Sequence, residues 1–123
     1  MRQRVLMVDD EKAILMAFRE LLGTPGVEVD TAETAEEAER LITSNDYQAV
    51  IVDVRLKGQR GDGGLAVLEH LRDTRPSAGT ILVTGYGSPE SMERAYNLGA
   101  SFYFEKPVSV DALKDALRSL GVG

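Results

Sequence analysis

The sequence predicts an α/β fold in which five parallel strands form one doubly wound sheet with helices on both faces. The chain alternates five times between a short apolar run of strand length and a longer segment with apolar residues at helical spacing. Short connections between such units favour parallel strands covered by helices on both sides. The 123 residues suffice for one substantial core, so we expect a single domain over residues 1–123.

In the first two strand–helix units, the helices are predicted most clearly. The run at residues 5–8 is followed by five apolar residues spaced i, i+1, i+4, i+7 and i+8, which is one face of a helix. Residues 23–26 (Gly-Thr-Pro-Gly) end that helix and open an alternating, weaker strand at 27–29, which we place near an edge of the sheet. Thr34 and Glu37 form a capping box that starts the second helix. The apolar face of the first helix consists of Ile14, Leu15, Phe18, Leu21 and Leu22.

The third unit begins with the run at 50–52, followed by a glycine-rich stretch and a helix that carries three leucines at helical spacing. Residues 75–76 (Arg-Pro) end this helix before the next apolar run at 81–83. The leucines are Leu65, Leu68 and Leu71.

The last two helices are predicted from their caps. Ser88 and Pro89 are typical of an N-cap and a first-turn proline, and Gly99 is placed to end that helix. The run at 102–104 is the last strand, and Ser109 is expected to cap the final helix.

Composition excludes several classes of function. The net charge of −6 argues against binding to nucleic acid or to an anionic membrane surface. No apolar run approaches the roughly 20 residues that span a bilayer, and the start of the chain has no signal-peptide pattern. The absence of cysteine excludes disulfides and thiolate chemistry. We therefore expect a cytoplasmic protein without direct nucleic-acid or membrane binding.

Polar side chains follow four of the apolar runs at the point where each strand ends: Asp9 and Asp10, Asp53, Thr84, and Lys106. Parallel strands bring their carboxyl ends to one edge of the sheet, where ligands bind in open α/β folds. Three carboxylates without a nearby His or Cys describe a site for a hard cation, and a lysine beside them describes an anion site. A metal and an anion together suggest phosphoryl chemistry.

Each of these signals also has an ordinary structural explanation. Asp10 could be a helix N-cap, Asp53 a turn residue, Thr84 a strand residue, and Lys106 merely the residue before a proline. Independent turn residues need not be chemically complementary, however, so all four groups at the same end of successive strands favour a functional site.

The whole set resembles the receiver domain of two-component response regulators, over essentially the entire chain. This resemblance implies a flavodoxin-like sheet of order 2-1-3-4-5 with five helices. The matching segments are Val8-Asp9-Asp10-Glu11, Val52-Asp53, Val83-Thr84-Gly85, Gly99-Ala100 and Tyr103-Phe-Glu-Lys106-Pro107.

The resemblance implies that Asp53 is the phosphoacceptor and takes a phosphoryl group from a histidine kinase or phosphotransfer protein. Asp10 and Asp53 would bind Mg²⁺ directly, with the backbone carbonyl of Arg55 as a third ligand and Asp9 acting mainly through metal-bound water. Lys106 would supply a counter-charge to a phosphoryl oxygen. The domain would be regulatory rather than an enzyme, assisting only its own phosphotransfer and dephosphorylation.

The resemblance also implies a switch. Thr84 would donate its hydroxyl to the phosphoryl group, and Tyr103 would turn inward when Thr84 moves. The signal would reach a downstream protein or fused output domain through the face formed by the helix after Ser88, the strand at 102–104 and the helix after Ser109.

One departure from the family pattern concerns the segment after the acceptor. The family usually has proline four residues after the acceptor, where this chain has Lys57, and the loop here is a few residues longer. We hypothesise that residues 57–64, rich in glycine, are mobile in the free state and become ordered on phosphorylation or partner docking. A solvated insertion without function is an equal alternative.

Two other functions remain as alternatives. A phosphatase of the haloacid dehalogenase type also uses a strand-end aspartate and Mg²⁺, but it needs a second acid two residues after the nucleophile, where this chain has Arg55. A pseudo-receiver that binds partners without phosphorylation is disfavoured by the complete set of acidic residues.

Overall fold

A computed structural model describes residues 3–54, 63–85 and 87–123 of the chain. Within these residues, strands and helices alternate five times, as the sequence predicts. The strands are β1 (Gln3–Val8), β2 (Val27–Ala32), β3 (Ala49–Asp53), β4 (Gly79–Thr84) and β5 (Phe102–Glu105). The helices are α1 (Lys12–Leu22), α2 (Ala35–Ser44), α3 (Gly63–Thr74), α4 (Pro89–Asn97) and α5 (Val110–Ser119).

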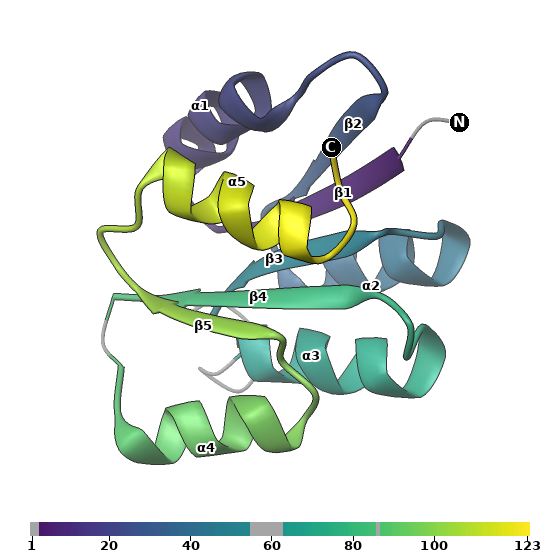
Figure 1. The fold of residues 1–123 in the computed structure, drawn as a ribbon. Helices are drawn as coiled ribbons and strands as arrows, with labels where there is room; N and C mark the ends of the chain where they lie inside the picture. The colour runs from purple at the N-terminus through teal and green to yellow at the C-terminus, as the bar shows by residue number, and fades with distance from the viewer. Residues whose placement is uncertain (1–2, 55–62, 86) are drawn as a thin grey trace.

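The five strands form one parallel sheet in the order β2-β1-β3-β4-β5 (Figure 1). The predicted order is therefore confirmed, and the alternating strand β2 lies at an edge. In the register of the sheet, Val8 pairs with Val52, and Asp53 pairs with Val83 of the next strand. The carboxyl ends of β1, β3 and β4 consequently lie side by side.

The sheet is covered on both faces, with α1 and α5 on one side and α2, α3 and α4 on the other (Figure 1). Each face has its own apolar cluster. Along β1, Leu6 and Val8 belong to the cluster under α2 and α3, whereas Val5 and Met7 belong to the cluster under α1 and α5. Because both faces of the strand are buried, its apolar run is unbroken rather than alternating.

The predicted caps form, with one difference in detail. Ser88 and Ser109 each accept the backbone N–H three residues further on, at 3.1 and 3.0 Å. Thr34 accepts the N–H of Glu37 in the same way at 3.1 Å, but the Glu37 carboxylate accepts the N–H of Glu33 at 3.0 Å instead of that of Thr34. The capping box therefore closes one residue earlier than the motif predicts.

The loop predicted over residues 57–64 ends two residues earlier than the sequence suggests. Gly63 and Gly64 begin α3, and both are buried. Residues 57–62 lie outside the described residues. Among the helices that are described, none has the length and apolar character needed to cross a bilayer.

Candidate functional site

Three carboxylates meet at the carboxyl edge of the sheet. Asp9 and Asp10 follow β1, and Asp53 is the last residue of the neighbouring strand β3. Each offers one carboxylate oxygen, and these oxygens lie within 4.8 Å of one another. Asp9 is only 3% exposed and Asp53 7%, while Asp10 is half-buried. A compact, largely buried set of oxygen ligands fits a hard divalent cation.

Backbone contacts hold Asp9 in place at the start of α1. Its N–H donates to the carbonyl of Ala32 at 3.1 Å, and its Oδ1 accepts the N–H of Glu11 at 2.9 Å. Glu11 occupies the N-cap of α1 without a side-chain cap. Asp10 therefore does not cap this helix, so the structural explanation for its carboxylate does not hold.

Lys106 lies across the acidic edge and contacts two of the carboxylates. Its Nζ donates to Asp53 Oδ2 at 3.0 Å and to Asp9 Oδ2 at 3.3 Å. The backbone N–H of Lys106 donates to the carbonyl of Thr84 at 2.7 Å, which fixes the end of β5 against β4. The peptide bond between Lys106 and Pro107 is cis. The sheet thus places an ammonium group directly beside the predicted acceptor.

Burial and charge act against each other in this cluster. Burial raises the pKa of the Asp9 carboxyl, although the N–H of Glu11 and the ammonium of Lys106 both oppose the rise. For Lys106, burial alone would lower the pKa of the ammonium, but its contacts with Asp53 and Asp9 together outweigh burial and raise it. Three carboxylates and one ammonium leave an excess of negative charge, which favours an additional cation at the site.

The two proposed switch residues lie on neighbouring strands. Thr84, the last residue of β4, is fully buried, and its Cα pairs with that of Glu105. Tyr103 of β5 pairs with Leu82, which precedes Thr84 by two residues in β4. The side chain of Tyr103 packs against the cluster under α2, α3 and α4. Since side chains of a strand alternate between faces, Thr84 and Tyr103 belong to the same face of the sheet. Arg55, the expected third metal ligand, lies outside the described residues.

A cavity of about 460 Å³ lies under the acidic edge, between the sheet and the helices α1 and α5. Asp9, Asp53 and Lys106 form its polar wall. Most of the remaining lining is apolar, including Phe18 of α1 and Leu113 of α5. The acceptor carboxylate is therefore mostly buried and still borders an open recess.

Sequence reasoning missed one residue of this site. Gly64 donates its N–H to the carbonyl of Val54 at 3.1 Å, and a Cβ added to it would lie 2.2 Å from the backbone oxygen of Asp53. Only glycine therefore allows α3 to approach the backbone of the acceptor so closely. The sequence offered a run of glycines as the signal, which we interpreted as loop mobility.

A doubly wound sheet with paired carboxylates after β1, an aspartate after β3 and a lysine after β5 defines a class of signalling module that phosphorylation controls. The sequence profile of the response regulator receiver domain matches residues 5–118. The chain belongs to this family, as the resemblance in its sequence predicts. The match favours neither the phosphatase nor the pseudo-receiver alternative.

Similar proteins agree with this family. The chain is 38% identical over 111 residues to the alginate biosynthesis transcriptional regulatory protein AlgB of Pseudomonas putida, covering 90% of this chain and 24% of AlgB. It is 31% identical over 118 residues to the photosynthetic apparatus regulatory protein RegA of Rhodobacter capsulatus, covering 95% of this chain and 62% of RegA. The chain thus spans less than two thirds of these relatives.

Solved structures show the same fold. A CheY-like receiver domain protein from Methanospirillum hungatei superimposes with a TM-score of 0.89 and 34% identity, over 98% of this chain and 95% of that one. A response regulator from Burkholderia pseudomallei, described with a phosphorylated aspartic acid, a calcium ion and citrate, gives a TM-score of 0.84 and 29% identity, over 94% of this chain and 66% of that one.

Proposed function

We propose that this receiver domain is a switch of a two-component phosphorelay in which Asp53 accepts a phosphoryl group from a histidine kinase or phosphotransfer protein in the presence of Mg²⁺. The observation that carries the proposal is the contact at 3.0 Å between Asp53 and Lys106, beside the carboxylates of Asp9 and Asp10. The residues proposed as nucleophile, cation ligands and counter-charge thus lie close together at one edge of the sheet.

Asp10 and Asp53 would hold the metal directly, with the backbone carbonyl of Arg55, and Asp9 would act through metal-bound water. The fit rests on the chemistry of the ligands, because the three carboxylates offer only oxygen and carry excess negative charge. Two unit charges about 4 Å apart repel by about 4 kcal/mol at an effective dielectric constant of about 20. A bound Mg²⁺ would offset that repulsion for an incoming anionic donor and orient its phosphoryl oxygens.

In the proposed transfer, a carboxylate oxygen of Asp53 attacks phosphorus as the bond from phosphorus to the histidine nitrogen breaks. The electron pair of that bond stays on the imidazole, and the phosphoryl group is then held as an aspartyl phosphate. Lys106 exchanges its contact with the carboxylate for one with a phosphoryl oxygen, and Thr84 donates its hydroxyl to another. These new contacts bias the domain toward a second conformation.

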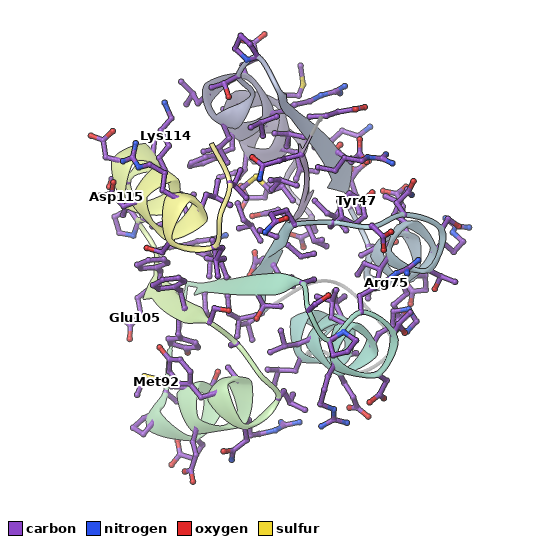
Figure 2. The ribbon with its side chains drawn as sticks, turned by 45° about the vertical axis from the view of Figure 1, so that its right-hand side comes forward. Tyr47, Arg75, Met92, Glu105, Lys114 and Asp115 are labelled. Carbon is purple, nitrogen blue, oxygen red and sulfur yellow. The ribbon has the colours of Figure 1, made fainter. Side chains whose placement is uncertain are left out.

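The proposed output face is formed by α4, β5 and α5. Figure 2 shows Met92, Glu105, Lys114 and Asp115 along one side of the molecule, projecting from these three elements. Met92 and Tyr96 of α4 are 43% and 48% exposed, which gives the face apolar contact area. A downstream protein or fused output domain would dock there, in the cytoplasm, and the greater length of AlgB and RegA supports a fused domain.

The test of the function is phosphorylation of Asp53. Incubation with a cognate kinase or acetyl phosphate, with Mg²⁺, is expected to add one phosphoryl group by mass spectrometry, and Asp53→Ala or chelation should abolish it. Asp46→Ala is the matched control, because Asp46 is an exposed aspartate at the opposite edge of the sheet and should leave labelling unchanged. Full labelling of Asp53→Ala would refute the assignment.

Thr84→Ala is expected to separate switching from metal binding. The variant should keep its Mg²⁺ affinity, because the side chain of Thr84 is not among the proposed metal ligands. It should bind the phosphoryl mimic beryllofluoride about tenfold more weakly, through loss of one hydrogen bond to a charged group. Titrations followed by NMR or tyrosine fluorescence measure both affinities. Thr84→Ser, which keeps the hydroxyl, is the control. A loss of Mg²⁺ affinity as large as that of Asp10→Ala would contradict the role of Thr84.

Asp9→Asn is expected to raise the free energy of unfolding of the metal-free protein at pH 7, because it removes a buried charge and keeps an acceptor for the N–H of Glu11. The folded-state pKa of Asp9 lies above its unfolded value. Protonation of Asp9 therefore stabilises the folded wild type. This contribution is complete below the unfolded-state pKa of about 3.9 and is lost as pH rises through the raised folded-state pKa.

The advantage of Asp9→Asn should accordingly shrink as pH falls from 7 toward 4, as urea unfolding at each pH would show. Asp46→Asn tests whether neutralising an exposed aspartate has the same effect. A difference between Asp9→Asn and wild type that widens toward pH 4 would contradict the direction of the shift.

A further inference from the structure

The hydroxyl of Ser91 links α4 to β5 through the side chain of Tyr103. Ser91 Oγ lies 3.2 Å from Tyr103 Oη, at hydrogen-bond distance, and either group can be the donor. Both side chains are half-buried. Ser91 is itself held in the first turn of α4, because its N–H donates to Ser88 Oγ at 3.1 Å. The contact thus fixes the tip of the tyrosine ring against the start of the helix.

Apolar contacts hold α4 only weakly. Within Pro89–Asn97, Ala95 alone is buried, whereas α3 buries six of its residues. Met92 and Tyr96, the large apolar residues of α4, remain 43% and 48% exposed. An element with so little buried apolar surface can shift at small cost. The hydrogen bond between Ser91 and Tyr103 is therefore one of the contacts that hold α4 in its position.

The same contact lies next to the proposed signalling path. Tyr103 and Thr84 belong to one face of the sheet, since their partners in the register are Leu82 and Glu105 on that face. If Tyr103 turns inward toward Thr84, its hydroxyl has to leave Ser91. The hydrogen bond then exists in the resting conformation and is lost in the other.

We propose that Ser91 is a positioning residue that holds Tyr103 in its resting orientation and so sets the resting bias of the switch. This inference rests on the proposed function and adds the residue that opposes the inward turn of Tyr103. A ligand that binds the second conformation has an apparent affinity proportional to the population of that conformation. Removing the hydroxyl of Ser91 raises this population before any phosphoryl group is bound.

The test compares beryllofluoride and Mg²⁺ affinities, measured by NMR titration, in wild type, Ser91→Ala, Tyr103→Phe and the double variant. Loss of one neutral hydrogen bond should tighten beryllofluoride binding of Ser91→Ala by roughly three- to tenfold, with Mg²⁺ affinity unchanged. In the Tyr103→Phe background the same substitution should have no effect, because the partner hydroxyl is already absent.

Two controls separate positioning from damage to the helix. Ser91→Thr keeps a hydroxyl and should restore the wild-type affinity, and Glu93→Ala, an exposed substitution in the same helix, should leave it unchanged. The role of Ser91 would be overturned if Ser91→Ala bound beryllofluoride with wild-type or weaker affinity, or if the substitution had the same effect in the Tyr103→Phe background. Neither outcome would contradict the proposed function. Wild type that binds no beryllofluoride would overturn the proposed function and this inference with it.

Discussion

Gly64→Ala is expected to lower the free energy of unfolding by about 3 kcal/mol and the Tm by roughly 10 °C. Helix propensity predicts the opposite sign, because alanine is better than glycine in a helix by about 1 kcal/mol. The packing decides, since the new Cβ would lie 2.2 Å from the carbonyl oxygen of Asp53 and 2.5 Å from the Cα of Val54. These are backbone atoms that cannot rotate away, so α3 or the end of β3 has to shift.

The same shift should impair phosphorylation, because it displaces the backbone that carries the acceptor. Thermal unfolding and labelling from acetyl phosphate measure the two effects on one sample. Gly85→Ala is the matched control for stability, since a Cβ on this glycine meets nothing within 4 Å. If Gly64→Ala is as stable as wild type and is labelled at the same rate, the close approach of α3 to Asp53 is not a constraint in solution.

Lys106→Met is expected to destabilise the metal-free protein by about 2 kcal/mol at pH 7 and to remove most of the response to phosphorylation. The substitution leaves the carboxylates of Asp9 and Asp53, 3% and 7% exposed, without the ammonium that they contact. Losing one partner of a buried ion pair is costly because the remaining charge is uncompensated. Mg²⁺ should restore most of the stability, since it brings positive charge to the same carboxylates.

The pH dependence of the stability difference between wild type and Lys106→Met gives a second test of the ion pair. The folded-state pKa of Lys106 lies above its unfolded value, so its contribution is complete below the ordinary lysine pKa and is lost as pH rises through the raised value. Urea unfolding should show wild type approaching Lys106→Met only above pH of about 10.4. Lys114→Met, the same substitution on α5, is the control for the loss of a lysine. Equal stability of Lys106→Met and wild type in metal-free buffer at pH 7 would contradict the ion pair.

The sequence by itself determined the five strand–helix units and the strand ends at which Asp9, Asp53 and Lys106 lie. These features are local, because hydrophobic periodicity, caps and strand termini are written in a few neighbouring residues. The placement of polar groups after successive parallel strands then brings them to one edge whatever the details of packing. For the same reason the residues around Ser88 and Ser109 are enough to identify these serines as caps.

Only the tertiary structure decided how these groups meet. Lys106 is separated in sequence by 53 positions from Asp53 and by 97 positions from Asp9. The lengths of its contacts with these two residues depend on the register of the whole sheet. The close approach of Gly64 to the acceptor backbone and the hydrogen bond between Ser91 and Tyr103 are likewise contacts between different elements. Such contacts follow from how helices pack on the sheet, which no local pattern of residues encodes.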